Sequence, residues 1–224
     1  MIIQQDEFIR INSPLETAYE DSVSSGATHF MGRYDTGFGV MWSPLIEVSK
    51  CRLSGGYDEY CLLIPKRDIN IIYAQQDINI TGDAVFLAGP TPRSKDVLSW
   101  RPKFIEDMIR RGFKGTILIP EFEDPSSWTE NFAYDKQIEW EMEAMDKADT
   151  IVFWIPRELP DMPAFTTNTE FGYWIAKDPS KINLGIPSDA VKCDYIKHLA
   201  KDNNIVCHNT TTDVIGELTK SKDE

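Results

Sequence analysis

Short apolar runs dominate the later part of the chain, and they are continuous rather than alternating. They span residues 84–88, 116–119, 150–155, 182–186 and 205–207. Continuous runs of this length are typical of strands buried on both faces. Apolar residues at helical spacing lie between them, led by Phe104, Ile138, Phe171 and Val191. This alternation predicts an α/β domain over residues 81–224, with a five-stranded parallel sheet and helices on both faces.

Residues 1–80 have a different pattern. Short runs rich in Val, Ile, Leu and aromatic residues occur at 38–40, 45–48, 61–64 and 70–73. The pair Gly55-Gly56 between two such runs favours a β-hairpin. We therefore expect a small, mostly antiparallel β region here, which serves as a lid, an oligomerisation arm or another interaction surface.

Composition narrows the function classes. The chain has 224 residues, enough for one domain and a small companion, and its net charge is -13. That charge disfavours polymeric nucleic acid but allows a small anion in a local cationic pocket. The four cysteines form no CxxC pair and only three histidines occur, which disfavours a zinc site. No apolar run is long enough for a membrane span and no signal pattern is visible, so we expect a soluble, cytoplasmic protein.

Ligands of parallel sheets bind at the carboxyl ends of the strands, so the loop after residues 84–88 is the first candidate site. A glycine there allows close approach of the backbone, and the polar groups that follow suit a sugar or a phosphate. The substrate-binding candidates in this loop are Gly89, Pro90, Thr91, Arg93 and Ser94. A tight turn with an exposed arginine is the alternative.

The segment from Pro163 to Gly172 opens a helix after the third run. Asn168 or Thr167 suits the N-cap, which places Glu170 in the first turn, where the helix dipole favours an ionised carboxylate. Such a carboxylate at the ligand edge could attack an anomeric carbon. A glutamate that only caps the helix fits the local sequence equally well.

Three further side chains are candidates at the same edge. Glu141, near the start of the preceding helix, could protonate a departing base, although solvated helix glutamates are common. Glu121 could accept hydrogen bonds from ribose hydroxyls. Trp154, at the end of a strand, could stack on a base.

Several motifs in order resemble the nucleoside 2-deoxyribosyltransferase-like family over about residues 84–218. They are Val85 to Pro90, Trp100-Arg101-Pro102, Ile138 to Glu141, Ala148 to Arg157 and Thr167 to Gly172. The resemblance implies a flavodoxin-like sheet, Glu170 as the nucleophile that forms a glycosyl-enzyme intermediate, and Glu141 as the group that handles the base.

The resemblance also implies that the Gly89-Pro90 loop lines the sugar site, that Asn168 and Thr169 contact substrate, and that a homo-oligomer completes the site. It implies no cofactor. One departure bears on sugar orientation and on exchange: where transferases of the family carry an aspartate, six residues before the nucleophile, this chain has Ala164.

The leading hypothesis is therefore cleavage or transfer of the N-glycosidic bond of a (deoxy)nucleoside or nucleoside 5'-monophosphate. A non-catalytic nucleotide sensor on the same scaffold is the alternative, and cleavage of a nicotinamide dinucleotide is a third.

Overall fold

The computed structural model describes most of the chain from Ile69 onwards and isolated strands before it. The described ranges are residues 2–4, 8–13, 29–35, 40–52, 58–65, 69–93, 97–123 and 133–219. Side-chain surroundings are described from Ile69 onwards within these ranges.

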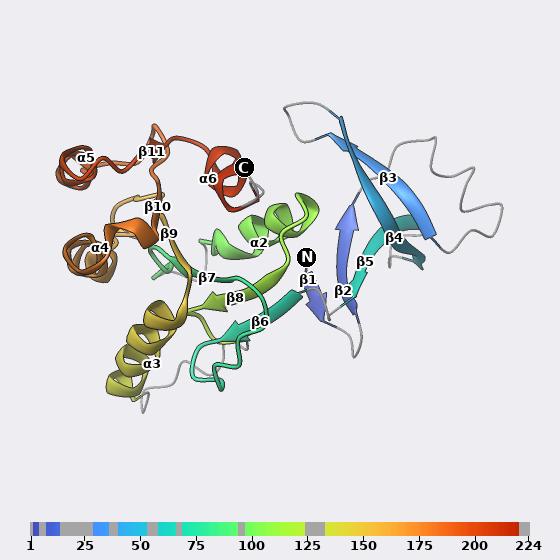
Figure 1. The fold of residues 1–224 in the computed structure, drawn as a ribbon, viewed down its shortest axis with the longest axis horizontal. Coiled ribbons are helices and arrows are strands. Elements are labelled where there is room, and N and C mark those ends of the chain that lie inside the picture. The colour runs from blue at the N-terminus through green and yellow to red at the C-terminus, as the bar shows by residue number, and fades with distance from the viewer. Residues whose placement is uncertain are drawn as a thin grey trace.

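A six-stranded sheet forms the centre of the later part of the chain (Figure 1). Its strands are β6 (Ile69–Tyr73), β7 (Ala84–Ala88), β8 (Gly115–Ile119), β9 (Thr150–Trp154), β10 (Ile182–Gly185) and β11 (Cys207–His208). The spatial order is β11-β10-β9-β7-β8-β6, and all neighbours pair in parallel. The predicted α/β class with a parallel sheet is therefore confirmed.

The strand count is six rather than the five expected from the sequence. The additional strand is β6, which the sequence pattern grouped with the amino-terminal region. It pairs with β8 in register from Ile69 opposite Gly115 to Tyr73 opposite Ile119. The other five strands, taken in chain order, lie in the order 2-1-3-4-5, which is the flavodoxin-like arrangement.

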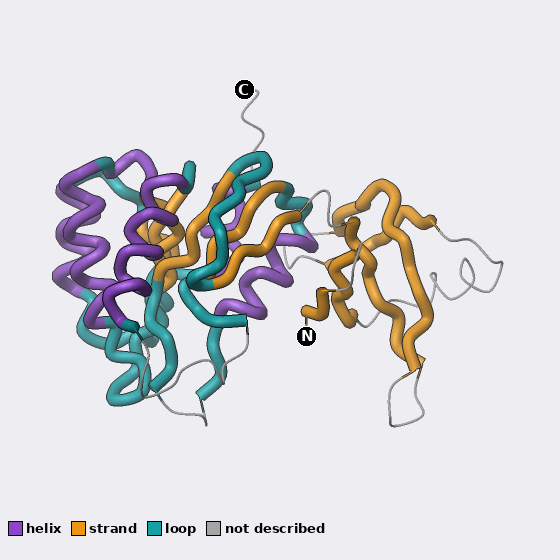
Figure 2. Tube along the Cα trace, turned by 90° about the horizontal axis from the view of Figure 1, so that it is seen from below, coloured by secondary structure: helices purple, strands orange, loops and turns teal. Residues whose placement is uncertain are grey.

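Helices cover both faces of this sheet, as predicted (Figures 1 and 2). One face carries α2 (Arg101–Arg110) and α6 (Thr211–Leu218). The other carries α3 (Tyr134–Lys147), α4 (Phe165–Lys177) and α5 (Asp194–Asp202), with a 3-10 turn, η4 (Pro179–Lys181), after α4. None of the described helices is both long and apolar enough to cross a lipid bilayer.

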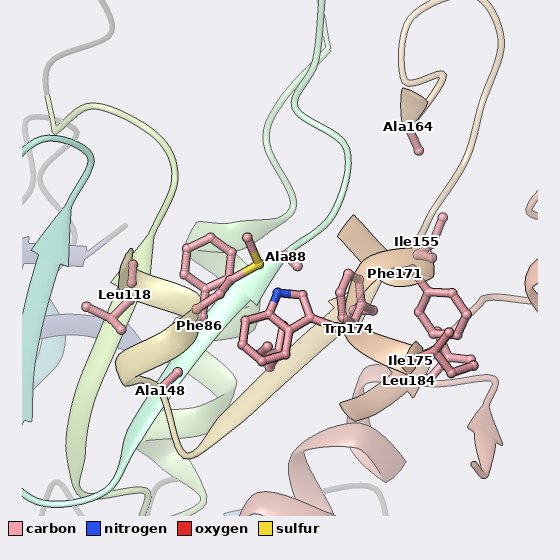
Figure 3. Packing of buried hydrophobic residues seen from close by; sticks show 14 of the residues in the cluster. Phe86, Ala88, Leu118, Ala148, Ile155, Ala164, Phe171, Trp174, Ile175 and Leu184 are labelled. Atoms are coloured by element: carbon pink, nitrogen blue, oxygen red, sulfur yellow. The ribbon is translucent and has the colours of Figure 1, made fainter. Parts of the chain in front are cut away.

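The core beneath α3, α4 and α5 holds α4 in a fixed rotation. Phe171 and Trp174 of α4 (Figure 3) are each 1% exposed. The Phe171 ring meets the Phe153 ring edge-on, with 5.3 Å between the ring centroids. Burying two large aromatic side chains on one stripe stabilises this orientation by about 1.5–3 kcal/mol for each side chain. Because that stripe faces the sheet, the rotation of Glu170, which precedes Phe171, is fixed as well.

The amino-terminal strands form a separate antiparallel sheet. They are β1 (Ile2–Gln4), β2 (Phe8–Ser13), β3 (His29–Asp35), β4 (Val40–Arg52) and β5 (Asp58–Pro65), in the order β1-β2-β5-β4-β3. The pairing of Arg52 with Asp58 confirms a β-hairpin around the Gly55-Gly56 pair, whose turn lies outside the described residues.

Candidate active site

A pocket lies at the carboxyl ends of β7, β8 and β9. Its walls come from Ala88 at the end of β7, Gly89 directly after it, Pro120 after β8, and residues 163–167 after β9. The chain order reverses between β7 and β9, and such a switch point is where parallel α/β sheets bind their ligands. The cavity volume is about 130 Å³. We call this cavity the Glu170 pocket.

Glu170 lines the pocket from the second turn of α4, not from the first turn as the sequence suggested. The helix begins at Phe165, with Ala164 as N-cap, so Glu170 is its sixth residue. Ala164 has φ 57° and ψ 42°, a left-handed conformation, and its side chain makes no capping hydrogen bond. Because the influence of the helix dipole fades after the first turn, it does little for the charge of Glu170.

Burial determines the protonation of Glu170. Loss of solvent, and to a lesser extent the negative charge of Glu141, raise the pKa of Glu170 to about 8, while the nearby Arg101 guanidinium acts in the opposite direction. The protonated form therefore predominates at neutral pH, contrary to the ionised carboxylate expected from the sequence. Desolvation outweighs the helix terminus here.

Glu141 lines the same pocket from α3. It lies close enough to Glu170 for the two carboxyl groups to interact electrostatically. Burial raises the pKa of Glu141, while a hydrogen bond from Gln137 and the charge of Arg101 lower it. Gln137 Nε2 donates to Glu141 Oε1 at 2.7 Å and to the Pro120 carbonyl oxygen at 3.3 Å. The two carboxyl groups therefore form one coupled acidic pair.

Arg101 is a buried cation that lines the pocket, and its role was not predicted from the sequence. It is 1% exposed and donates to the carbonyl oxygens of Leu87 and Gly89 at 3.1 and 2.7 Å. It also donates to Thr91 Oγ1 at 3.2 Å and to Glu121 Oε1 at 2.6 Å. These bonds fix the loop after β7. The one sequence signal for Arg101 was its place in the Trp100-Arg101-Pro102 motif.

The predicted loop residues contribute unequally. Gly89, Thr91 and Arg93 line the pocket, whereas Pro90 lies behind it with its carbonyl oxygen accepting from Trp100 Nε1 at 3.0 Å. A Cβ on Gly89 would lie 2.2 Å from the Trp154 carbonyl oxygen, so this close approach requires glycine. Ser94 lies outside the described residues.

Arg93 is the exposed cation at the pocket mouth. Its guanidinium group lies over the Phe165 ring, 5.1 Å from the ring centroid. No ion pair involves Arg93 in the part of the chain that the structure describes. Phe165 and Tyr134, which the sequence analysis did not select, are 64% and 52% exposed and line the same pocket.

Besides Pro90, four predicted site residues do not line the pocket. Glu121 accepts hydrogen bonds from Arg101 and from Ser99 Oγ at 2.8 Å. Trp154 is 7% exposed in the core beneath α2 and α6. Asn168 accepts a hydrogen bond from Arg157, and Thr169 Oγ1 lies 3.5 Å from the Phe165 carbonyl oxygen within α4.

Comparison with known protein families identifies the segment that contains this pocket. Residues 82–188 match the family model described as nucleoside 2-deoxyribosyltransferase like. All residues that line the Glu170 pocket fall within this segment. The resemblance inferred from the sequence is therefore confirmed. A search of curated proteins found no match to the chain.

Proposed function

We propose that the Glu170 pocket cleaves or exchanges an N-glycosidic bond, because residues 82–188 match the nucleoside 2-deoxyribosyltransferase-like family model. The substrate is a (deoxy)nucleoside or a nucleoside 5'-monophosphate. One observation carries the proposal: two carboxyl groups, Glu170 and Glu141, line one small cavity at the switch point of the sheet.

The chemistry requires one carboxylate and one proton. A Glu170 oxygen forms a bond to C1' while the bond from C1' to the base nitrogen breaks, and the base leaves with the electron pair. Glu141 gives its proton to the base. Water or a nitrogen of a second base then attacks C1', Glu141 takes up the proton of the attacking group, and the C1'–Glu170 ester bond breaks.

The coupled pair supplies both requirements in its singly protonated state. With the single proton on Glu141, Glu170 is the nucleophile and Glu141 is the acid. In the resting pair the proton lies on Glu170, whose pKa the negative charge of Glu141 raises, so the reactive arrangement forms when this proton passes to Glu141. Arg101 does not select between the two arrangements, because its positive charge lowers the pKa of both carboxyl groups. The raised pKa values of both carboxyls keep one proton in the pocket near neutral pH.

Arg93 supports a 5'-phosphate on the substrate. It lies at the mouth without a carboxylate partner among the described residues, so its charge is available to an anion. The absence of an acidic side chain at Ala164, which also lines the pocket, removes one source of repulsion for that anion. A nucleoside monophosphate is thus the substrate form that the charges favour.

The test is incubation with a panel of nucleosides and 5'-monophosphates, with and without a free acceptor base. We expect base release that disappears in Glu170→Ala and persists in Glu139→Gln, a matched control because Glu139 is an exposed glutamate of α3. Base release at the wild-type rate in Glu170→Ala would refute the nucleophile. Release without exchange identifies a hydrolase, and a sugar ester on Glu170 in quenched wild-type protein would demonstrate the intermediate.

A nucleotide sensor is the second candidate, and the protonation of Glu170 favours it, because a neutral carboxylic acid at pH 7 is a poor nucleophile. A sensor would be stabilised against heat by a nucleotide, would turn over no member of the panel, and would keep its affinity in Glu170→Gln. Turnover that depends on Glu170 excludes it.

A further inference from the structure

A second cavity lies between the loop that follows β9 and the loop that follows β10. Its volume is about 600 Å³, and residues 156–159, Met162 and 189–192 line it. It shares no lining residue with the Glu170 pocket. Asn168, which contacts Arg157 of this cavity, and Glu170 are about 200° apart around α4, so the two cavities lie on different sides of the helix. We call it the Arg157 groove.

Arg157 is a buried cation without a counter-charge. It is 7% exposed, and its two hydrogen bonds go to neutral acceptors, the Lys192 carbonyl oxygen at 2.7 Å and Asn168 Oδ1. Its Nε is buried with no partner. Within the described ranges, no carboxylate lies at ion-pair distance from it. Three of the five N–H groups of its guanidinium therefore have no acceptor among the residues that the structure describes.

Arg101 shows how a buried arginine of this protein obtains hydrogen-bond acceptors and a counter-charge from the chain itself. It has four hydrogen bonds, one of them to a carboxylate. A buried charge that lacks such a partner is costly, since the lost hydration is not replaced. The difference between the two arginines points to an acceptor for Arg157 that is not part of the chain.

The other charged groups of the groove lie at its rim. Glu158, Asp189 and Lys192 are all exposed, so water and salt screen their charges. The Arg157 guanidinium is desolvated and is screened much less. The inner wall of the groove is therefore cationic, although its rim has one negative charge more than positive.

We propose that the Arg157 groove binds a small oxyanion, a phosphate or carboxylate group that accepts hydrogen bonds from the remaining Nη1 and Nη2 N–H groups of Arg157. A planar guanidinium suits such groups because two N–H donors can meet two oxygens. This site is separate from the phosphate position proposed beside Arg93, and it does not depend on the proposed reaction.

The test is titration of the full-length ¹⁵N-labelled protein with inorganic phosphate and, separately, with acetate, at constant ionic strength maintained with NaCl. We expect the Arg157 Nε–H resonance to shift in a saturable way with at least one of the two anions. We also expect that anion to bind about tenfold or more weakly to Arg157→Met, and within about twofold of wild type to the matched variant Arg93→Met.

A wild-type spectrum in which neither anion moves the Arg157 resonance would overturn the proposal, and this measurement needs no folded variant. Equal affinity of wild type and Arg157→Met would also overturn it, as would binding that Arg93→Met abolishes. The two anion arms show whether the groove prefers phosphate or carboxylate.

Discussion

The buried Glu170 carboxyl makes the stability of the protein depend on pH. Its folded pKa is about 8, against 4.5 for the unperturbed group, so between these values the folded chain holds a proton that the unfolded chain has lost. This contribution to stability is complete below about pH 4.5 and is lost as pH rises through about 8. The slope is at most about 1.4 kcal/mol per pH unit.

Glu170→Gln removes this titration. We therefore expect the free energy of unfolding, measured in urea between pH 5 and 9, to fall less with pH in Glu170→Gln than in wild type. Glu139→Gln, which removes an exposed carboxyl, should follow wild type. Equal pH slopes for Glu170→Gln and wild type would show that Glu170 is not a raised-pKa group.

The pH dependence of kcat/KM should reflect the titration of the same coupled pair, Glu170 and Glu141. If the singly protonated pair is the active form, kcat/KM declines above about pH 8, where the last proton is lost, and also declines in acid. Glu141→Gln removes the acid and one like charge, so the pKa of Glu170 falls. We expect that variant to lose the alkaline decline and to have a maximal rate about 10²–10⁴-fold lower. An alkaline decline at the same pH in Glu141→Gln would contradict this assignment.

Single residues were predictable where local chemistry and the family resemblance pointed to the same position. Glu170, Glu141, Gly89, Thr91 and Arg93 were selected from the sequence, and all line the pocket. Buried polar partners were not predictable, because an arginine or a glutamine in a helix is usually solvated. Arg101 and Gln137 are each 1% exposed only because four elements converge around them.

At the scale of elements, the start of α4 shows that tertiary structure can override the local preference of residues for the N-cap position. Thr167 and Asn168 have good capping side chains, and they suggested a later start. The helix instead begins beyond Ala164, which has a positive φ that alanine rarely adopts. Alanine is a poor N-cap residue, so its presence at this position indicates that packing of residues 163–167 around the pocket determines where α4 begins.

This conformation predicts an unusual order of two alanine-to-glycine effects. Ala164→Gly should change the free energy of unfolding by less than about 0.5 kcal/mol. Relief of about 1 kcal/mol of strain in the left-handed backbone conformation should offset the loss of the buried methyl group and the greater conformational freedom of glycine in the unfolded chain. Ala176→Gly, at an exposed helical position of the same α4, should cost about 1 kcal/mol. Urea denaturation measures both. Burial alone predicts the opposite order, because Ala164 is 4% exposed, so a larger cost at Ala164 would exclude the strain.

At the scale of the whole molecule, the parallel sheet begins earlier than the change of sequence pattern. Residues 69–73 look like the strands before them, and their partner β8 is more than forty residues away in the chain. Local pattern cannot reveal such a pairing. The strand contributes two buried side chains, Ile69 and Ile72, to the two cores.

A domain cut at residue 81, as the sequence suggested, therefore lacks an edge strand. A fragment of residues 69–224 should keep the cooperative unfolding of the α/β domain. A fragment of residues 81–224 should be less stable by at least about 3 kcal/mol, because two isoleucines lose their burial. It should also aggregate more readily, because β8 then has an unpaired edge.

The variant Ile72→Ala in the full-length chain separates side-chain burial from the loss of the edge. It should cost about 2–5 kcal/mol without promoting aggregation, since β6 remains paired with β8. Urea denaturation and size-exclusion chromatography distinguish these effects. Equal stability and solubility of the two fragments would place the boundary of the folded unit at residue 81. In that case β6 would pair with the sheet without contributing to its stability.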